Sequence, residues 1–340
     1  LEHRRQRQMC IRDRNNTKST QLNKTTLNNQ EKKIKSNPYS KNYGKVKLRT
    51  DATQDSLRVL TLEQWEFWKD QGYVLIKNAV SRAQAQKTAS FLWEFEDKDP
   101  NDPKTWYTAP RAEIEMKELA GTGMVEAYNH QLLWNNRQTQ KVYDAFVDVW
   151  GTQKLWVTID RGNLNFPIRP GYQYKSFIHW DLDPEIKLQN VQGVLALNDQ
   201  TDENMGGFQC IPWLYKHYDT WKLTQPKDAH FFKPDITGLK DKMVKVRMET
   251  GDLLIFNSTQ PHGIRPNHSQ GKVRIAQYIS MAPAQEDNQD LREWRINSWK
   301  HRIAPKGYAF PGDPRNLEQN KYPTAKLSDL GEKLLGLKKF

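Results

Sequence analysis

The chain has 340 residues, of which 36% are hydrophobic and 11% aromatic, enough for one large domain or two small ones. It has no run of about 18 apolar residues and no apolar signal-peptide core near its start, so we expect no membrane span. Its two cysteines, Cys10 and Cys210, lie far apart, which argues against a disulfide framework and fits a cytoplasmic location.

The formal net charge of +12 is concentrated in residues 1–50, which carry 14 Lys and Arg against 3 acidic residues. The remaining chain is close to neutral, so nucleic acid is not an expected partner of the folded part. Residues 1–50 are polar and lack an apolar period, which predicts a disordered basic tail. Part of this tail, Gln8–Arg14, resembles translated sequencing-adapter debris and is not expected to contribute to the fold. A basic arm that binds nucleic acid is the alternative for the tail.

Residues 51–340 are expected to form a single domain that begins with helices. A capping box at Thr61–Gln64 predicts a helix start just after Leu60. Apolar residues at helical spacing predict further helices at 81–96, 139–150, 286–299 and 327–337. Residues 97–112 are expected to be a loop, and 214–242 a polar excursion with one short helix.

Short apolar runs separated by turn residues predict a mostly β core that the helices flank. The predicted strands are 73–77, 155–159, 176–182, 191–197, 207–211, 243–248, 253–256 and 273–281. Strands of this length and spacing are typical of a β-sandwich or barrel. Cys210 is interpreted as a small buried hydrophobic residue in its strand.

The predicted strand at 176–182 carries His179 and Asp181 two positions apart, so both side chains point to one face and Trp180 to the other. An imidazole and a carboxylate side by side can hold a divalent metal. We choose His262 as the third ligand, because it follows the strand 253–256 and adjoins a glycine that permits close approach. Two His and one carboxylate leave open positions, which suits non-haem Fe(II) oxygen chemistry.

Arg274 lies twelve residues after His262, on the last predicted strand. It shares one face of that strand with Ala276, Tyr278 and Ser280. An Arg on an inner face of a sheet favours a carboxylate partner, which its planar fork binds through two parallel hydrogen bonds.

In this order, His179-x-Asp181, His262 and Arg274 resemble the Fe(II)/2-oxoglutarate-dependent dioxygenases. The segments Gly251–Phe256 and Gly206–Pro212 are most similar to the phytanoyl-CoA dioxygenase family, over roughly residues 60–300. The resemblance implies a double-stranded β-helix (jelly-roll, cupin-like) core. It also implies that His179, Asp181 and His262 bind iron and that Arg274 pairs with the distal carboxylate of 2-oxoglutarate.

The same resemblance places Arg161, Asn163 and Lys175 near the pocket, because the family often lines its pocket with this region. We expect Asn163 and Lys175 on the cofactor side, and Arg161 and Trp180 on the substrate side. A hydrated sheet end is the alternative for the three polar residues, and a plain core position is the alternative for Trp180.

Other residues compete for these roles. Asp183 shares the face of Asp181, His268 is a rival to His262, and Arg265 is a rival to Arg274 that lies close to the metal in sequence. A hydrogen-bonded pair is the alternative for His179 and Asp181, and a salt bridge across the barrel is the alternative for Arg274. A zinc hydrolase with the same ligands lacks an evident general base.

The resemblance implies an oxygenase that hydroxylates or oxidatively dealkylates a small metabolite, with O₂ as co-substrate and succinate and CO₂ as products. An oxygenase or demethylase acting on protein or nucleic acid is the second hypothesis, and the basic tail is its support. A jelly-roll binding module without catalysis is the third. The sequence does not indicate the substrate or the oligomeric state.

Overall fold

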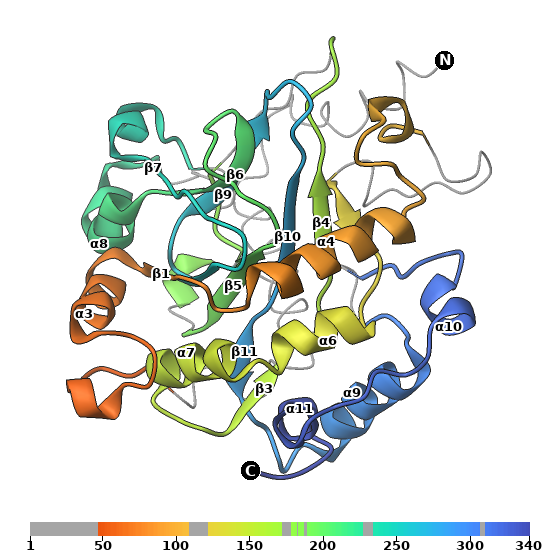
Figure 1. Cartoon of the computed structure of the whole chain (residues 1–340). Coiled ribbons are helices and arrows are strands. Elements are labelled where there is room, and N and C mark those ends of the chain that lie inside the picture. The colour runs from red at the N-terminus through yellow and green to blue at the C-terminus, as the bar shows by residue number, and fades with distance from the viewer. Residues whose placement is uncertain are drawn as a thin grey trace, which may run out of the picture. The chain divides into compact units, whose positions relative to one another are not determined.

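The computed structural model describes residues 47–108, 122–171, 178–181, 183–186, 189–226, 234–306 and 310–340 (Figure 1). The predicted tail up to residue 46 lies outside the described residues. From Leu48 onward the chain already contacts the domain, because the Leu48 N–H donates to Gln189 at 2.7 Å and the Arg49 N–H to the Val149 carbonyl at 3.1 Å. The domain contacts therefore begin a few residues before the predicted boundary at 51.

The strands form three antiparallel sheets. The largest has the order β1-β8-β5-β10-β4-β2 and the second the order β7-β6-β9, while β11 pairs with β3. The bounds in the large sheet are β1 Tyr73–Ile76, β8 Leu253–Asn257, β5 Val191–Ala196, β10 Arg274–Tyr278, β4 Gly162–Asn165 and β2 Met124–Val125. The others are β7 Val244–Lys245, β6 Met205–Cys210, β9 His262–Asn267, β11 Met281–Pro283 and β3 Leu155–Val157.

Side chains on the inner face of the large sheet meet those of the second sheet. This inner cluster contains Val194, Ala196, Phe208, Cys210, Val246, Met248, Leu254, Phe256 and Ala276. Its members come from both sheets and alternate along β5 and β8 with residues of the opposite face, as a pleated strand requires. Two facing antiparallel sheets with flanking helices confirm the predicted jelly-roll fold class, and Cys210 is buried as expected.

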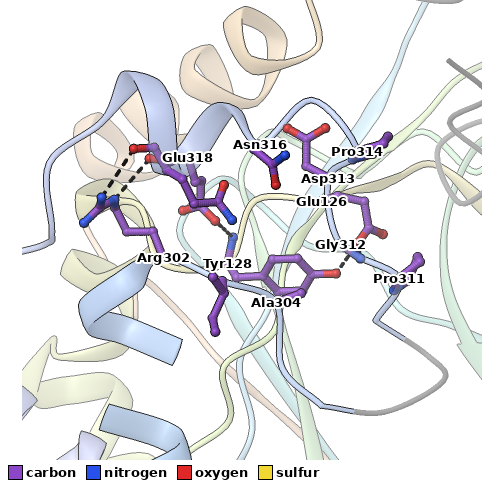
Figure 2. A pocket seen from close by; sticks show the side chains of 12 residues that line it. Glu126, Tyr128, Arg302, Ala304, Pro311, Gly312, Asp313, Pro314, Asn316 and Glu318 are labelled. Carbon is purple, nitrogen blue, oxygen red and sulfur yellow. Dashed lines mark hydrogen bonds between the residues drawn. The ribbon is translucent and has the colours of Figure 1, made fainter. Parts of the chain in front are cut away.

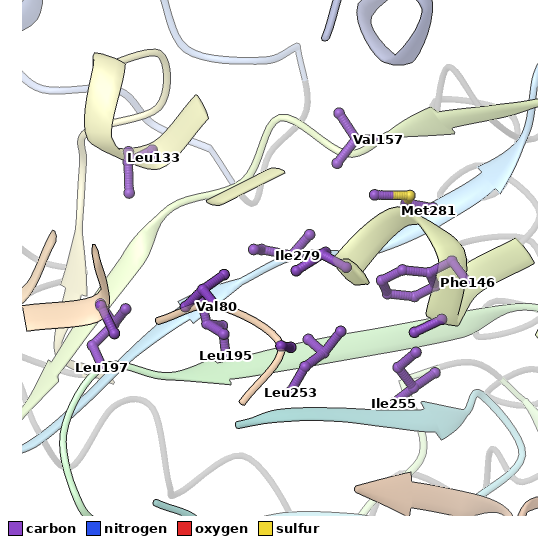
Figure 3. Packing of buried hydrophobic residues seen from close by; sticks show 14 of the residues in the cluster. Val80, Leu133, Phe146, Val157, Leu195, Leu197, Leu253, Ile255, Ile279 and Met281 are labelled. Carbon is purple, nitrogen blue, oxygen red and sulfur yellow. The ribbon is translucent and has the colours of Figure 1, made fainter. Parts of the chain in front are cut away.

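The outer face of the large sheet packs against the helices (Figures 1 and 3). Leu195, Leu253 and Ile255 point toward Phe146 of α7 and Ile279, and all five belong to one buried cluster. Fully burying side chains of this size contributes about 1.5–3 kcal/mol each, so this layer holds the large sheet firmly.

The helices are capped much as the sequence predicts. Thr61 forms a capping box at the start of α3, Ser81 caps α4, and Gly72 and Gly151 end α3 and α7 in the left-handed conformation. The α-helices are α3 Leu62–Gln71, α4 Arg82–Phe95, α6 Gln131–Arg137, α7 Gln140–Trp150, α8 Pro212–Trp221, α9 Gln289–His301, α10 Leu317–Lys321 and α11 Asp329–Leu335. The 3-10 turns are η2 Gln54–Ser56, η3 Pro103–Thr105, η4 Pro184–Ile186, η5 Lys222–Thr224 and η6 Thr237–Lys242.

Several predicted strands differ from the structure. The described part of 176–182 is an isolated bridge, His179 to His262, rather than a strand within a sheet. His262 begins β9 instead of lying in a loop. The predicted strand 273–281 is divided, because Ile279 donates to the Gly193 carbonyl and the chain then turns to pair with β3. The elements β2, β4, β9, α6 and α10 were not predicted.

Described residues of the segment 214–242, which was predicted as a polar excursion, pack against the stretch that contains His179. Leu214 of α8 and Leu239 of η6 pack with Ile178 and Trp180 in a separate buried cluster. This segment therefore anchors the residues on either side of His179. Among the described residues, no helix is long and apolar enough to cross a membrane.

Candidate metal centre

His179, Asp181 and His262 lie together, with one ligand atom of each within 4.8 Å of the others. The two histidines are brought together by a reciprocal pair of backbone hydrogen bonds, 2.9 Å and 3.0 Å long. The Nε2 atom of His179 is 3.4 Å from Asp181 Oδ1, and that of His262 is 3.5 Å from Asp181 Oδ2. Two imidazole nitrogens and a carboxylate thus converge on a space of the size that a divalent ion occupies.

The three side chains differ in exposure. The exposed fractions are 9% for His262, 24% for His179 and 41% for Asp181. The phenyl ring of Phe256 lies 4.5 Å from the His262 ring, and that of Phe208 stacks on it at 5.8 Å. The cluster is therefore buried on the His262 side and open on the Asp181 side, where another molecule can approach.

The charges in the cluster suit a cation. Burial lowers the pKa of His262, which keeps the imidazole neutral and its lone pair available. Its Nδ1 lies 3.0 Å from the Gln260 carbonyl, an acceptor that favours a proton on Nδ1 and leaves Nε2 free to bind metal. Burial tends to raise the pKa of Asp181, but His262, His179 and Gln192 outweigh it and lower that pKa.

Trp180 points away from the cluster. It is fully buried, its indole N–H donates to the Thr259 carbonyl at 2.9 Å, and its ring packs on Tyr218 of α8. These contacts anchor the stretch between His179 and Asp181. They do not support the predicted role of Trp180 in substrate binding.

Arg274 lies on β10 with a fully buried side chain. Its Nε donates to Gln200 Oε1 at 3.2 Å, and its Nη1 to Asn163 Oδ1 at 3.2 Å and to the Tyr278 hydroxyl at 3.4 Å. All three acceptors are neutral. Its Nη2 is buried and has no hydrogen-bond partner among the described residues. A buried guanidinium in this state has the capacity to bind a carboxylate.

The rival residues have other contacts. Arg265 donates through both terminal nitrogens to the backbone carbonyls of Phe208 and Gly206. The Asp183 carboxylate accepts the Glu185 N–H at the start of η4. Neither Asp183 nor His268 belongs to the metal-competent group found in the described residues. Of the predicted cofactor residues, Asn163 contacts Arg274, and Lys175 lies outside the described residues.

Arg161 lies in a different environment from the metal cluster. Its Nη1 forms a buried ion pair with Glu126 at 2.6 Å, and its guanidinium lies 4.9 Å from the Phe310 ring. Glu126 lines a cavity of about 460 Å³ between the β2 segment and the C-terminal segment (Figure 2). None of the three candidate ligands lines this cavity. Because Glu126 already neutralises Arg161, its contacts do not support a role in binding an anionic substrate.

Three polar residues near the site were given no role from the sequence, although Tyr278 was placed on the face of Arg274. Gln192 donates to Asp181, while Gln200 and Tyr278 surround Arg274. All three lie on or next to strands that the sequence does predict, and each points to the inner face. A polar residue on the inner face of an apolar strand is the signal that would have identified them.

The protein resembles known proteins over most of its length. The family model of phytanoyl-CoA dioxygenase (PhyH) matches residues 68–276. The Ava biosynthesis cluster protein O of Aspergillus versicolor is 27% identical over 271 residues, which are 70% of this chain and 84% of that relative.

Two solved structures share the fold. The hypothetical protein JW0805 from Escherichia coli has a TM-score of 0.60 and 17% identity, over 82% of this chain and 81% of that one. The GlcNAc-inducible protein GIG2 from Candida albicans has a TM-score of 0.60 and 15% identity, over 84% of this chain and 78% of that one. Since the family model matches more than half of the residues, the chain belongs to the phytanoyl-CoA dioxygenase family and is an oxidoreductase of the dioxygenase type whose cofactors are iron and 2-oxoglutarate.

Proposed function

We propose that this dioxygenase hydroxylates or oxidatively dealkylates a small metabolite and releases succinate and CO₂. The observation that carries the proposal is the pairing of two features on the inner side of the sheets. One is the His179, Asp181 and His262 cluster, and the other is a buried Arg274 whose hydrogen-bond partners are all neutral. Metal binding and recognition of a diacid are the two requirements of this chemistry.

The donor set fits Fe(II). Two imidazoles and one carboxylate would hold one side of the ion and leave its other positions for a chelating oxo acid and O₂. Bound iron supplies the activation of O₂ that the side chains themselves lack. The chain contributes the convergence of the three ligands, through the backbone bridge between His179 and His262.

The environment of Arg274 fits the distal carboxylate of 2-oxoglutarate. Gln200 and Asn163 hold the guanidinium in place without neutralising it. Its Nη2 supplies two N–H groups, and a buried charge of this kind gains most from an ionised partner. A dicarboxylate that reaches from the iron to Arg274 would satisfy both.

A small molecule is the substrate class that we favour. The relative from Aspergillus versicolor is named as a biosynthesis cluster protein, and such clusters act on small metabolites. Asp181 is the exposed side of the cluster, so the substrate would approach from there.

The test measures succinate formed from 2-oxoglutarate by the purified chain, with and without Fe(II), first alone and then with a panel of small metabolites. We expect succinate that depends on Fe(II), and an increase with the true substrate class. His179→Ala is expected to abolish it, whereas His268→Ala is a matched control that leaves it intact. Full turnover by the His179→Ala variant would remove the proposal.

The competing hypothesis of a macromolecular substrate rests on the basic residues 1–50. A variant that begins at residue 47 distinguishes the small-molecule hypothesis from the macromolecular one. Unchanged turnover of small molecules by this variant supports a small-molecule enzyme, and loss of turnover on a protein or nucleic acid would support the alternative.

A further inference from the structure

Gln192 connects the large sheet to the metal cluster. It lies on β5, in the middle of the large sheet, and its Nε2 donates a hydrogen bond to Asp181 Oδ2. Asp181 follows the bridge that joins His179 to β9 of the second sheet. This bond therefore links the two sheets at the exposed side of the cluster.

The position of Gln192 follows from strand geometry. Gln192 is two residues before Val194, so both side chains point to the inner face of β5. Its partner across the ladder is Phe256 of β8, the residue whose ring lies 4.5 Å from the His262 ring. Adjacent strands of the large sheet thus contact two of the three candidate ligands, one through an amide and one through an aromatic ring.

The hydrogen bond makes the two oxygens of Asp181 different. Oδ2 accepts the amide N–H of Gln192 and lies 3.5 Å from His262 Nε2, while Oδ1 lies 3.4 Å from His179 Nε2 and has no contact with Gln192. An amide N–H can only donate, so this contact favours the ionised carboxylate and fixes its rotation. Both oxygens then face a histidine, and Oδ1 is the one whose lone pairs are not shared with Gln192.

We propose that Gln192 is a positioning residue for the metal, which holds Asp181 through Oδ2 so that Oδ1 is presented to the ion. This inference rests on the metal centre of the proposed function and extends it to a residue that does not touch the ion. Residues that hydrogen-bond to metal ligands typically change metal affinity by about 10- to 100-fold when they are replaced. We expect Gln192 to fall in this range.

The experiment is a double-mutant cycle on the full chain, with Ni(II) binding measured by calorimetry so that no turnover is needed. The four proteins are the wild type, Gln192→Met, Asp181→Ala and the double variant. Met matches Gln in length but cannot donate a hydrogen bond. We expect Gln192→Met to weaken Ni(II) binding by about 10- to 100-fold in the wild type and by less than about twofold once Asp181 is absent.

Gln277→Met is the matched control. Gln277 is a fully buried glutamine on β10 that points to the opposite face and contacts Asn136 and the Leu133 carbonyl. The Gln277→Met substitution should lower the melting temperature without changing the affinity for Ni(II). Gln192→Leu is a second substitution that removes the hydrogen-bond donor. The same loss of Ni(II) affinity in both variants would show that the effect is not a folding defect of one of them.

The outcomes separate the two levels of inference. If the wild type binds no Ni(II), the metal centre itself is refuted. If it binds and Gln192→Met leaves affinity unchanged, or weakens it equally with and without Asp181, the positioning role of Gln192 is overturned while the centre stands.

Discussion

Replacing Arg274 with Met tests the diacid site most directly. Among the described residues, none accepts from the two N–H groups of Nη2, while the other donors are held by neutral oxygens at 3.2–3.4 Å. A hydrogen bond to a charged group contributes about 1.5–3 kcal/mol, so two of them to a carboxylate contribute about 3–6 kcal/mol. At 1.4 kcal/mol per factor of ten, Arg274→Met should weaken 2-oxoglutarate binding by roughly 100- to 10,000-fold.

The assay is calorimetric titration of the Ni(II)-loaded chain with 2-oxoglutarate, alongside a thermal melt of each variant. Arg274→Lys keeps the charge but not the planar fork, so its affinity should lie between those of the wild type and the Met variant. Arg265→Met is the control, since its terminal nitrogens already bind backbone carbonyls. Affinity within threefold of the wild type for Arg274→Met, or a selective loss for Arg265→Met, would refute the assignment.

Two further predictions concern stability. A Cβ on Gly193 would lie 2.1 Å from the Ile279 carbonyl oxygen and 2.9 Å from Phe146, whereas one on Gly238 meets nothing within 4 Å. Gly193→Ala should therefore cost about 3 kcal/mol or more in denaturant unfolding, and Gly238→Ala should be nearly neutral; equal midpoints would contradict this packing. Burial raises the pKa of Glu96 to about 7 against the opposing effect of Arg315, and burial also raises the pKa of Glu318 to about 7. These pKa values lie above that of Glu in the unfolded chain, so the folded state binds more protons than the unfolded state. Raising the pH from 6.5 to 8.5 should therefore lower the unfolding free energy by roughly 1 kcal/mol for each Glu. Glu96→Gln should remove about half of that slope, and an unchanged slope would show that Glu96 is ionised throughout.

The grouping of His179 with Asp181 could be predicted because strand alternation relates residues two positions apart. It placed His179 and Asp181 on one face and Trp180 on the other, and it placed Arg274 on the face opposite Ile275. Helix caps at Thr61 and Ser81 are equally local signals, and the structure has both.

The features that were missed depend on contacts between distant residues. β4 reads Gly-Asn-Leu-Asn, a composition that strands avoid, and it forms because β10 and β2 pair with it on either side. β9 contains Pro266, which is tolerated because β9 is an edge strand of its sheet. The partner of Arg161 is Glu126, which lies 35 residues earlier, so no local pattern indicates that its charge is neutralised.

Three buried arginines lie on or beside the strands β4, β9 and β10, and their partners explain why one of them is suited to an anion. The charge of Arg161 is neutralised by Glu126. Both terminal nitrogens of Arg265 donate to backbone carbonyls. Gly207 leaves space for the Arg265 side chain, because a Cβ there would lie 2.7 Å from Arg265 Nη2.

Arg274 differs because Gln200 donates its own amide to the Ile275 carbonyl at 2.9 Å and so must present its oxygen to the guanidinium. These neutral partners fix the orientation of the guanidinium but do not balance its charge. A buried charge without an anionic partner costs free energy. In the proposed function, a bound dicarboxylate would relieve that cost, and the large sheet would then contribute to the selectivity for 2-oxoglutarate before the ligand binds.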